Sequence, residues 1–137
     1  MRLFVDTSAW FALYSARDEA HSRASRFWKE LRRKSVRLVT TEHVFGESIT
    51  LMRARGGHRA ACRLGSILLN SRIVEIADVP AQTRGRAWEV FVKYSDKDFS
   101  FTDCTSFVVM RELGLTDAFT FDDHFAQMGF NLRPSRG

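Results

Sequence analysis

Proline, cysteine and long apolar runs are scarce in this sequence, and each scarcity excludes a class of protein. Only two residues are proline while 45% are hydrophobic, which argues against a disordered chain. The two cysteines, Cys62 and Cys104, lie too far apart for a zinc-binding spacing, and a reducing cytoplasm is expected. No apolar run reaches membrane-spanning length, and the N-terminus lacks the apolar stretch of a signal peptide. We therefore expect one folded cytoplasmic domain of 137 residues without a membrane segment.

Lysine is also scarce, because 17 of the 21 basic residues are arginine. The formal net charge is +5, and the planar guanidinium of arginine suits phosphate oxygens. This balance favours nucleic acid or an acidic protein as a partner, although a solubilising surface explains the charge alone equally well. Two stretches gather the basic side chains: Arg32, Arg33, Lys34 and Arg37, and then Arg53, Arg55, His58, Arg59 and Arg63.

The aspartates are distributed unevenly. Six of the nine fall in the C-terminal third of the chain: Asp96, Asp98, Asp103, Asp117, Asp122 and Asp123. A basic chain that concentrates its aspartates in one region has a local need for negative charge. A metal site is one such need, and the capping of helices is the competing one.

Strand-like and helix-like patterns alternate along the chain. Short apolar runs predict strands at 2–5, 36–39, 73–76, 117–121 and 130–132. Helical periodicity predicts helices at 8–16, 20–34, 41–56, 102–112 and 122–128, and one that follows Gly57 and ends near residue 69. A further predicted helix begins at Pro80, and its expected buried side carries Ala87, Trp88, Phe91 and Val92. The expected fold is a single three-layer α/β/α domain over residues 1–137. Its short, mostly parallel sheet has four or five strands, and residues 133–137 form a frayed tail.

Asp6 directly follows the first predicted strand, where open α/β sheets bind ligands. Glu47, Asp103 and Asp122 fall at similar junctions between strands and helices. If the four side chains converge, they form a site for a hard cation such as Mg²⁺ or Mn²⁺. Each aspartate also has a structural explanation as a helix cap or first-turn acid. Thr7 or Ser8 would cap the first helix, and Thr102 would cap the helix that carries Asp103.

Glu47 has a different structural alternative, because it lies inside a helix and would simply face solvent. Its spacing from Val44 and Leu51 places it beside the apolar stripe, where an acid without a partner is unusual. Asp98 and Asp123 are weaker candidates for an additional ligand, and the four histidines show no mutual spacing suited to metal or triad chemistry. Supporting roles are expected for three polar residues near the site: Ser8, Thr102 and Ser106.

Four converging carboxylates suit metal-assisted hydrolysis of a phosphodiester. Their charges repel one another unless a cation binds, and the cation would polarise the phosphate and activate water. Arginines around such a site would hold the backbone of a nucleic acid.

The sequence around these acids resembles the PIN-domain family. The resemblance rests on Val5-Asp6-Thr7-Ser8, on Glu47 after Val44-Phe45-Gly46, on Phe101-Thr102-Asp103 and on Thr120-Phe121-Asp122-Asp123-His124-Phe125. It covers nearly the whole chain in the order typical of the family. The small single-domain format looks like the VapC-type toxins of bacterial toxin–antitoxin pairs.

The resemblance implies a metal-dependent endoribonuclease that uses Mg²⁺ or Mn²⁺. The acidic residues of the family fall on Asp6, Glu47, Asp103 and Asp122, with Asp98 or Asp123 as a possible extra ligand. It also implies RNA as the substrate, a cognate antitoxin that reaches into the active site, and a homodimer.

A homodimer is also suggested by the aromatic content of 17 residues in 137. Tryptophan and phenylalanine are favoured at the centres of interfaces, and a well-filled core is the alternative explanation. The candidates for the interface are Trp10, Phe11, Tyr14, and Phe27 or Trp28.

Three other functions fit parts of the pattern. A receiver-like phosphoacceptor domain would need an acidic pair after the first strand and a late lysine, but no lysine follows Lys97. A haloacid-dehalogenase-like phosphatase would need Asp-x-Asp, where Ser8 occupies the second acidic place. A catalytically silent RNA-binding or interaction module is disfavoured by the complete acidic set, and nuclease assays with Mn²⁺ would separate it from an enzyme.

Overall fold

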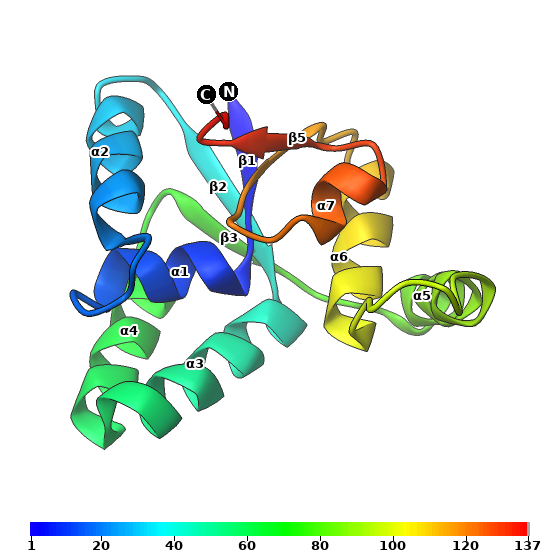
Figure 1. The fold of residues 1–137 in the computed structure, drawn as a ribbon, viewed down its shortest axis with the longest axis horizontal. Helices are drawn as coiled ribbons and strands as arrows, with labels where there is room; N and C mark the ends of the chain where they lie inside the picture. Colours follow the sequence, from blue (N-terminus) through cyan, green and yellow to red (C-terminus); the bar gives the residue numbers. More distant parts are fainter. Residues whose placement is uncertain (137) are drawn as a thin grey trace.

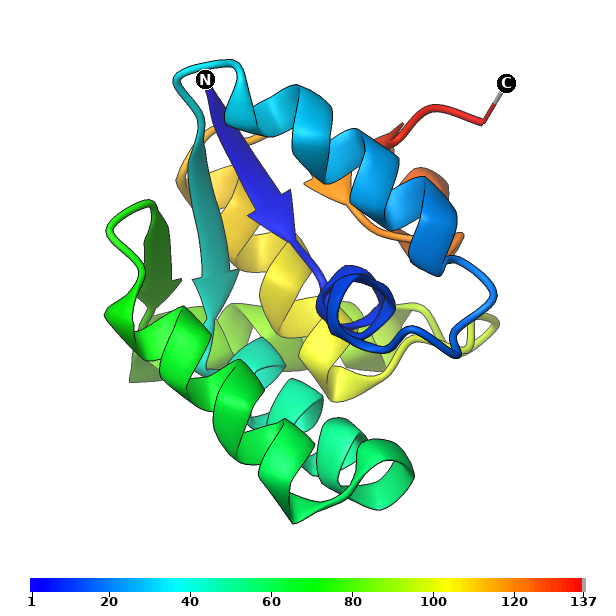
Figure 2. The same ribbon diagram turned by 90° about the vertical axis from the view of Figure 1, so that its left-hand side faces the viewer.

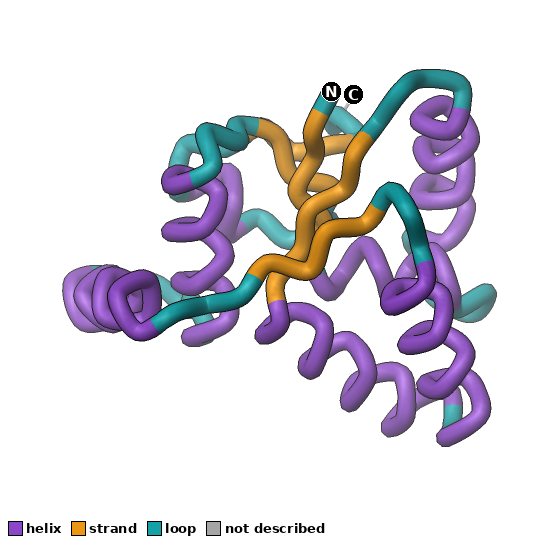
Figure 3. Tube along the Cα trace, turned by 180° about the vertical axis from the view of Figure 1, so that it is seen from behind, coloured by secondary structure: helices purple, strands orange, loops and turns teal. Residues whose placement is uncertain are grey.

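The structure is a computed structural model that describes residues 1–136, and a five-stranded sheet runs through its centre (Figures 1 and 3). The strands lie in the order β3-β2-β1-β4-β5, and every neighbouring pair is parallel. Their bounds are β1 Arg2–Val5, β2 Arg37–Thr41, β3 Val74–Ala77, β4 Asp117–Phe119 and β5 Asn131–Arg133. The predicted α/β fold with a parallel sheet is therefore confirmed, with five strands.

Helices cover both faces of the sheet. They are α1 Thr7–Tyr14, α2 His21–Arg32, α3 Glu42–Gly56, α4 His58–Asn70, α5 Ala81–Lys93, α6 Phe101–Glu112 and α7 His124–Gln127. In Figure 1, α1, α2 and α4 lie on one side of the strands and α6 and α7 on the other, while α5 packs outside α6. No helix within residues 1–136 has both the length and the apolar character needed to cross a membrane.

The central strand β1 is apolar along its whole inner length. Leu3, Phe4 and Val5 are fully buried, as expected for a parallel strand covered on both faces. Leu3 pairs with Leu38 of β2, and Val5 pairs with Phe119 of β4. Figure 2 shows β1 and β2 side by side with their arrowheads pointing the same way. The carboxyl ends of the strands therefore meet at one edge of the sheet.

The order of the strands creates a crevice at that edge. From β1 the chain proceeds to β2 and β3 on one side, and later places β4 and β5 on the other side of β1. The connections thus diverge between β1 and β4, which is where open α/β sheets bind ligands. Asp6 follows β1 and Thr120 follows β4, so both residues stand at this crevice.

Helix ends follow the predicted signals in α3 but not in α6. The Thr41 hydroxyl accepts a hydrogen bond from the Val44 N–H at 3.1 Å and caps α3 as predicted. Gly57, with a φ of 94°, lets the chain turn from α3 into α4. The predicted cap of α6, Thr102, is wrong because the cap is Ser100. The helix also begins one residue earlier than predicted, at Phe101.

The predicted buried side of α5 is largely wrong. Ala87 is fully buried, but Trp88, Phe91 and Val92 are 57%, 41% and 57% exposed. The reason is that α5 packs mainly on α6, outside the layer next to the sheet, so a narrow stripe of the helix suffices for packing. Thr83 belongs to that stripe, and its hydroxyl donates to Glu112 Oε1 at 2.8 Å.

The end of the chain lies against the body of the protein. Arg133, which was assigned to the predicted frayed tail, belongs to β5, and Arg136 donates a hydrogen bond to Asp123. Of the five residues assigned to that tail, Gly137 lies outside the described residues.

Candidate active site

Asp6, Asp103 and Asp122 meet at the crevice between β1 and β4. Asp6 follows β1 directly, Asp103 lies in the first turn of α6, and Asp122 lies between β4 and α7. Asp6 and Asp103 are buried, and Asp122 is half-buried. Residues up to 116 positions apart in the sequence thus form one group of carboxylates, the acidic cluster.

Two hydroxyl groups hold the carboxylate of Asp6. Its Oδ2 accepts hydrogen bonds from Thr120 at 3.1 Å and from Ser8 at 3.2 Å. Ser8 also accepts the N–H of Phe121 at 2.9 Å, which ties the start of α1 to the segment after β4. Asp6 occupies the N-cap position of α1 in place of the predicted Thr7 or Ser8, but its side chain makes no capping bond. The carboxylate is therefore oriented from both sides of the crevice, by Ser8 of α1 and by Thr120 after β4.

Asp103 is both a capping residue and a member of the acidic cluster. Its N–H donates to Ser100 Oγ at 2.9 Å, while its Oδ2 accepts the Ser100 N–H at 3.0 Å. This reciprocal pair is a capping box, which fixes the side chain at the start of α6. The structural explanation and the site explanation of Asp103 are thus compatible.

His124 is a site residue that sequence reasoning missed. Its Nδ1 lies 2.8 Å from Asp103 Oδ2 and 3.3 Å from Asp122 Oδ1. Ligand atoms of Asp103, Asp122 and His124 lie within 4.8 Å of one another, as in a metal site. The lack of a suitable mutual spacing among the four histidines therefore did not exclude a single histidine from the site. The feature of the sequence that could have indicated His124 is its position two residues after Asp122. The His124 N–H donates a hydrogen bond to Asp122 Oδ1 at 2.9 Å.

Burial and mutual repulsion raise the proton affinity of the acidic cluster. Burial is the main cause that raises the pKa of Asp6 to about 7, and the negative charge of Asp103 adds to the effect. The pKa of Asp103 is also raised by burial, and hydrogen bonds from Ser100 and His124 partly offset this change. Carboxyl groups in this state gain most from a nearby cation, which would favour their charged forms.

Each carboxylate keeps one oxygen without a partner in the part of the chain that the structure describes. Local hydrogen bonds use Oδ2 of Asp6, Oδ2 of Asp103 and Oδ1 of Asp122. Three carboxylate oxygens thus remain for another group, and oxygen donors suit Mg²⁺ and Mn²⁺. The residues present therefore fit a hard divalent cation.

The other predicted acidic candidates make no hydrogen bond or ion pair with the acidic cluster within residues 1–136. Glu47 is exposed on α3. Its carboxylate therefore needs no buried partner, although its spacing from Val44 and Leu51 predicted a position beside the apolar stripe. Within residues 1–136 it makes no ion pair. Asp98 is likewise exposed and unpaired in that range, and Asp123 is engaged by Arg136. Of the polar residues expected to support the site, Ser8 does so directly, whereas the buried Ser106 hydroxyl has no protein partner in the described range.

The PIN domain family matches residues 3–131 of the sequence. This chain belongs to the PIN-domain family. The four segments that resembled the family all fall within the matched range. The acidic cluster thus lies in a PIN domain, as predicted.

This PIN domain is similar to ribonucleases of the VapC type. It is 42% identical over 133 residues to the 23S rRNA-specific endonuclease VapC20 of Mycobacterium tuberculosis, covering 96% of this chain and 98% of the relative. A VapC ribonuclease of Archaeoglobus fulgidus is 28% identical over 128 residues, with 92% and 80% covered. These relatives bear out the predicted function of a toxin ribonuclease.

Solved structures agree with the fold. The crystal structure of Mycobacterium tuberculosis VapC20, described as a sarcin–ricin loop cleaving toxin, aligns with a TM-score of 0.87 and 41% identity, covering 93% of this chain and 95% of that one. The structure of VapBC2 from Rickettsia felis, bound to a DNA fragment from its promoter, has a TM-score of 0.71 at 12% identity, with 97% and 98% covered. The second likeness concerns the fold alone.

Proposed function

We propose that this PIN domain is a cation-dependent endoribonuclease that acts as the toxin of a VapBC-type toxin–antitoxin pair. The observation that carries the proposal is the acidic cluster, formed by Asp6, Asp103 and Asp122 in a chain 42% identical to an endonuclease. The site draws on Asp6 and on Asp122, near opposite ends of the sequence, so we propose that residues 1–137 act as one domain.

Mg²⁺ or Mn²⁺ is the proposed cofactor, held by Asp6, Asp103 and Asp122 with Glu47 at the edge of the site. When bound, such a cation polarises a phosphate oxygen and activates the attacking water. The protein residues keep the carboxylates in fixed orientations. Thr120 and Ser8 hold Asp6, while His124 and the Ser100 N–H both hold Oδ2 of Asp103. Fixed orientation reduces the reorganisation needed during the reaction.

Ribosomal RNA of the large subunit is the proposed substrate. The relative at 42% identity is named a 23S rRNA-specific endonuclease, and its solved structure is described as cleaving the sarcin–ricin loop. A net charge of +5, with arginine as 17 of the 21 basic residues, supports a polyanionic substrate. With this substrate we propose a cytoplasmic location.

A cognate antitoxin and a homodimer complete the proposal. The antitoxin follows from the toxin character of the relative. Of the interface candidates, Trp10, Phe11 and Phe27 are at most 6% exposed and belong to the core of the protomer, whereas Tyr14 is 36% exposed. Further exposed apolar side chains lie on α5, where Trp88 stacks on Phe91 with ring centres 5.9 Å apart.

The test is cleavage of purified 23S rRNA with mapping of the new RNA ends. We expect cleavage with Mg²⁺ or Mn²⁺, no cleavage in EDTA, and a loss of at least about 100-fold for Asp103→Asn. Glu75→Gln removes an exposed carboxylate outside the site and is the matched control. Cleavage that persists in EDTA would contradict the cation, and RNA binding without any cleavage would favour the silent module.

A further inference from the structure

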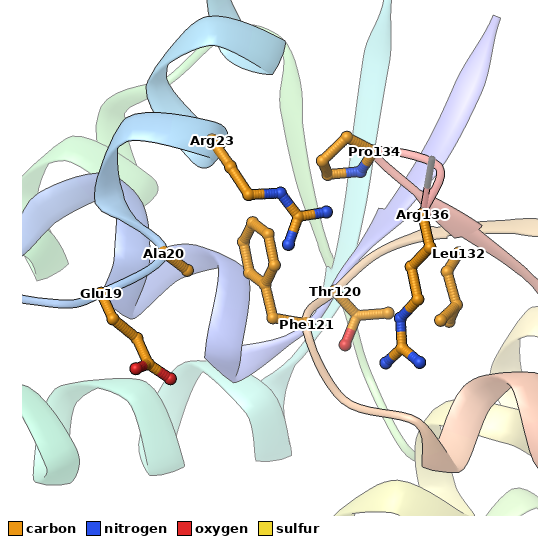
Figure 4. Close-up of a pocket in the computed structure, with 8 residues that line it drawn as sticks. All are labelled: Glu19, Ala20, Arg23, Thr120, Phe121, Leu132, Pro134 and Arg136. Atoms are coloured by element: carbon orange, nitrogen blue, oxygen red, sulfur yellow. The ribbon is translucent and has the colours of Figure 1, made fainter.

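A pocket of about 290 Å³ lies directly beside the acidic cluster (Figure 4). Its walls include Arg23, Thr120, Phe121, Leu132, Pro134 and Arg136. Thr120 belongs to both places, because its hydroxyl donates to Asp6 Oδ2 at 3.1 Å and accepts the Asp122 N–H at 3.0 Å. A group bound in the pocket is therefore separated from the acidic cluster by a single side chain.

Two guanidinium groups from distant segments give the pocket a positive character. Arg23 comes from α2 and Arg136 from the end of the chain, and Figure 4 shows them on either side of Thr120. The pocket also contains Glu19, which lies on the far side of Phe121 from Arg136 in this view. Arg136 is engaged by Asp123, whereas no carboxylate within residues 1–136 pairs with Arg23. Arg23 is therefore the charge available to a ligand.

An aromatic ring holds Arg23 in place. Its guanidinium carbon lies 5.3 Å from the centre of the Phe121 ring, the distance of a cation–π contact. Phe121 is itself fixed, because its N–H donates to Ser8 Oγ at 2.9 Å and its ring packs against Phe119. Arg23 is exposed on α2, yet its guanidinium rests on the segment that carries Asp122. A preorganised guanidinium binds phosphate at a lower cost in side-chain entropy.

We propose that this pocket binds a backbone phosphate of the RNA next to the scissile phosphate, with Arg23 as the main contact and Arg136 as the second. The inference rests on the proposed ribonuclease function and adds residues that position the substrate. Its physical basis is that the acidic cluster repels a polyanion, so an adjoining cationic site is needed to retain the strand. The geometry favours RNA over an acidic peptide because the guanidinium groups flank Thr120, beside the carboxylates.

The first experiment measures RNA binding without cleavage. The probe is a fluorescein-labelled RNA hairpin with the sarcin–ricin loop sequence, titrated by anisotropy in EDTA at several salt concentrations. We expect Arg23→Gln to weaken binding about 10-fold and to reduce the salt slope by about 0.7, the value for one phosphate contact on a single strand. Arg33→Gln, at the other end of α2, removes the same charge and should change binding less than about twofold.

The second experiment locates the contact. Single methylphosphonate substitutions remove the charge of each phosphate around the cleaved bond. We expect one adjacent position to weaken binding to the wild-type protein, and the same position to have no further effect on Arg23→Gln. With Mg²⁺, the KM of Arg23→Gln should rise about 10-fold while kcat stays within about twofold, because the residue binds substrate and does not touch the reacting atoms.

The outcomes separate this inference from the proposed function. Equal RNA affinity for Arg23→Gln and Arg33→Gln overturns the inference even if the wild-type protein cuts RNA. Loss of antitoxin binding with unchanged RNA binding also overturns it, and assigns the pocket to an acidic peptide. Binding that depends on Arg23 without any cleavage supports the pocket and rejects the ribonuclease proposal. Equal melting temperatures of the variants verify that the fold is intact.

Discussion

Asp6 is the residue at which a structural role and a catalytic role predict opposite results. Asparagine caps helices about as well as aspartate, but it lacks the charge that a cation requires. We expect Asp6→Asn to abolish RNA cleavage while the protein melts near or above the wild-type temperature in metal-free buffer, because carboxylate repulsion is relieved. Calorimetry with and without Mn²⁺ should show that most of the stabilisation by the cation is lost. Cleavage at the wild-type rate would reject the catalytic assignment.

The raised pKa of Asp6 also predicts how stability depends on pH. The carboxyl titrates near 3.8 in an ordinary environment and near 7 in the folded protein. Between these values the folded state holds a proton that the unfolded state has lost, so the free energy of unfolding falls as pH rises. Urea denaturation in EDTA at pH 5, 6 and 7 should show this decline, and Asp6→Asn should make it shallower. If the free energy of unfolding of Asp6→Asn falls with pH as steeply as that of the wild-type protein, groups other than Asp6 cause the decline.

The residues of the site were only partly predictable from sequence. Asp6 and Asp122 follow strands, so their positions could be inferred from local pattern and sheet topology. His124 could not, because its contact with Asp103 joins residues 21 positions apart and depends on how α7 packs against α6. For Glu47 the sequence pattern predicted a position that would need a partner, but the side chain is exposed, because a helical position beside an apolar stripe can still face solvent.

Among the elements, the start of α6 links folding to the site, because the Ser100 cap and the Asp103 carboxylate form one capping box. We expect Ser100→Ala to lower the free energy of unfolding by about 1 kcal/mol, since the Asp103 N–H loses its partner. Thr102→Ala is the control, because the hydroxyl of Thr102 makes no hydrogen bond within residues 1–136 and should cost less. Urea denaturation of both variants measures the difference, and equal losses would contradict the cap assignment.

The lengths of the elements show where local pattern fails. The apolar run at 117–121 predicted a five-residue strand, but β4 ends at Phe119. After Phe119, the Phe121 N–H donates a hydrogen bond to Ser8 Oγ and the Thr120 hydroxyl donates one to Asp6. These two residues therefore form hydrogen bonds in the candidate site and do not extend the strand. In α5 the helix was predictable but its exposed face was not. Sequence periodicity does not reveal that a helix packs on another helix, outside the layer next to the sheet.

For the whole molecule, the exposed face of α5 predicts self-association. A patch with Trp88, Phe91 and Val92 more than 40% exposed is unusual for a monomer. We expect light scattering to give twice the 15.8 kDa mass of the chain, and Trp88→Glu to shift the protein toward monomer. Leu69→Glu places the same charge on an exposed apolar position of α4 and should leave the dimer intact. A wild-type monomer at high micromolar concentration would contradict the proposal.

The central position of β1 also bears on when the protein can become active during its synthesis. Of the five strands, β1 is translated first and lies in the middle of the sheet, but its neighbour β4 and the Asp122–His124 segment are translated only after α6. A nascent chain that has emerged only through α6 carries Asp6 and Asp103 without the strand that brings Asp122 beside them. A ribosome that makes this protein therefore translates past Asp122 before the acidic cluster can form. The proposed antitoxin, if it binds the completed crevice, would have the same interval in which to arrive.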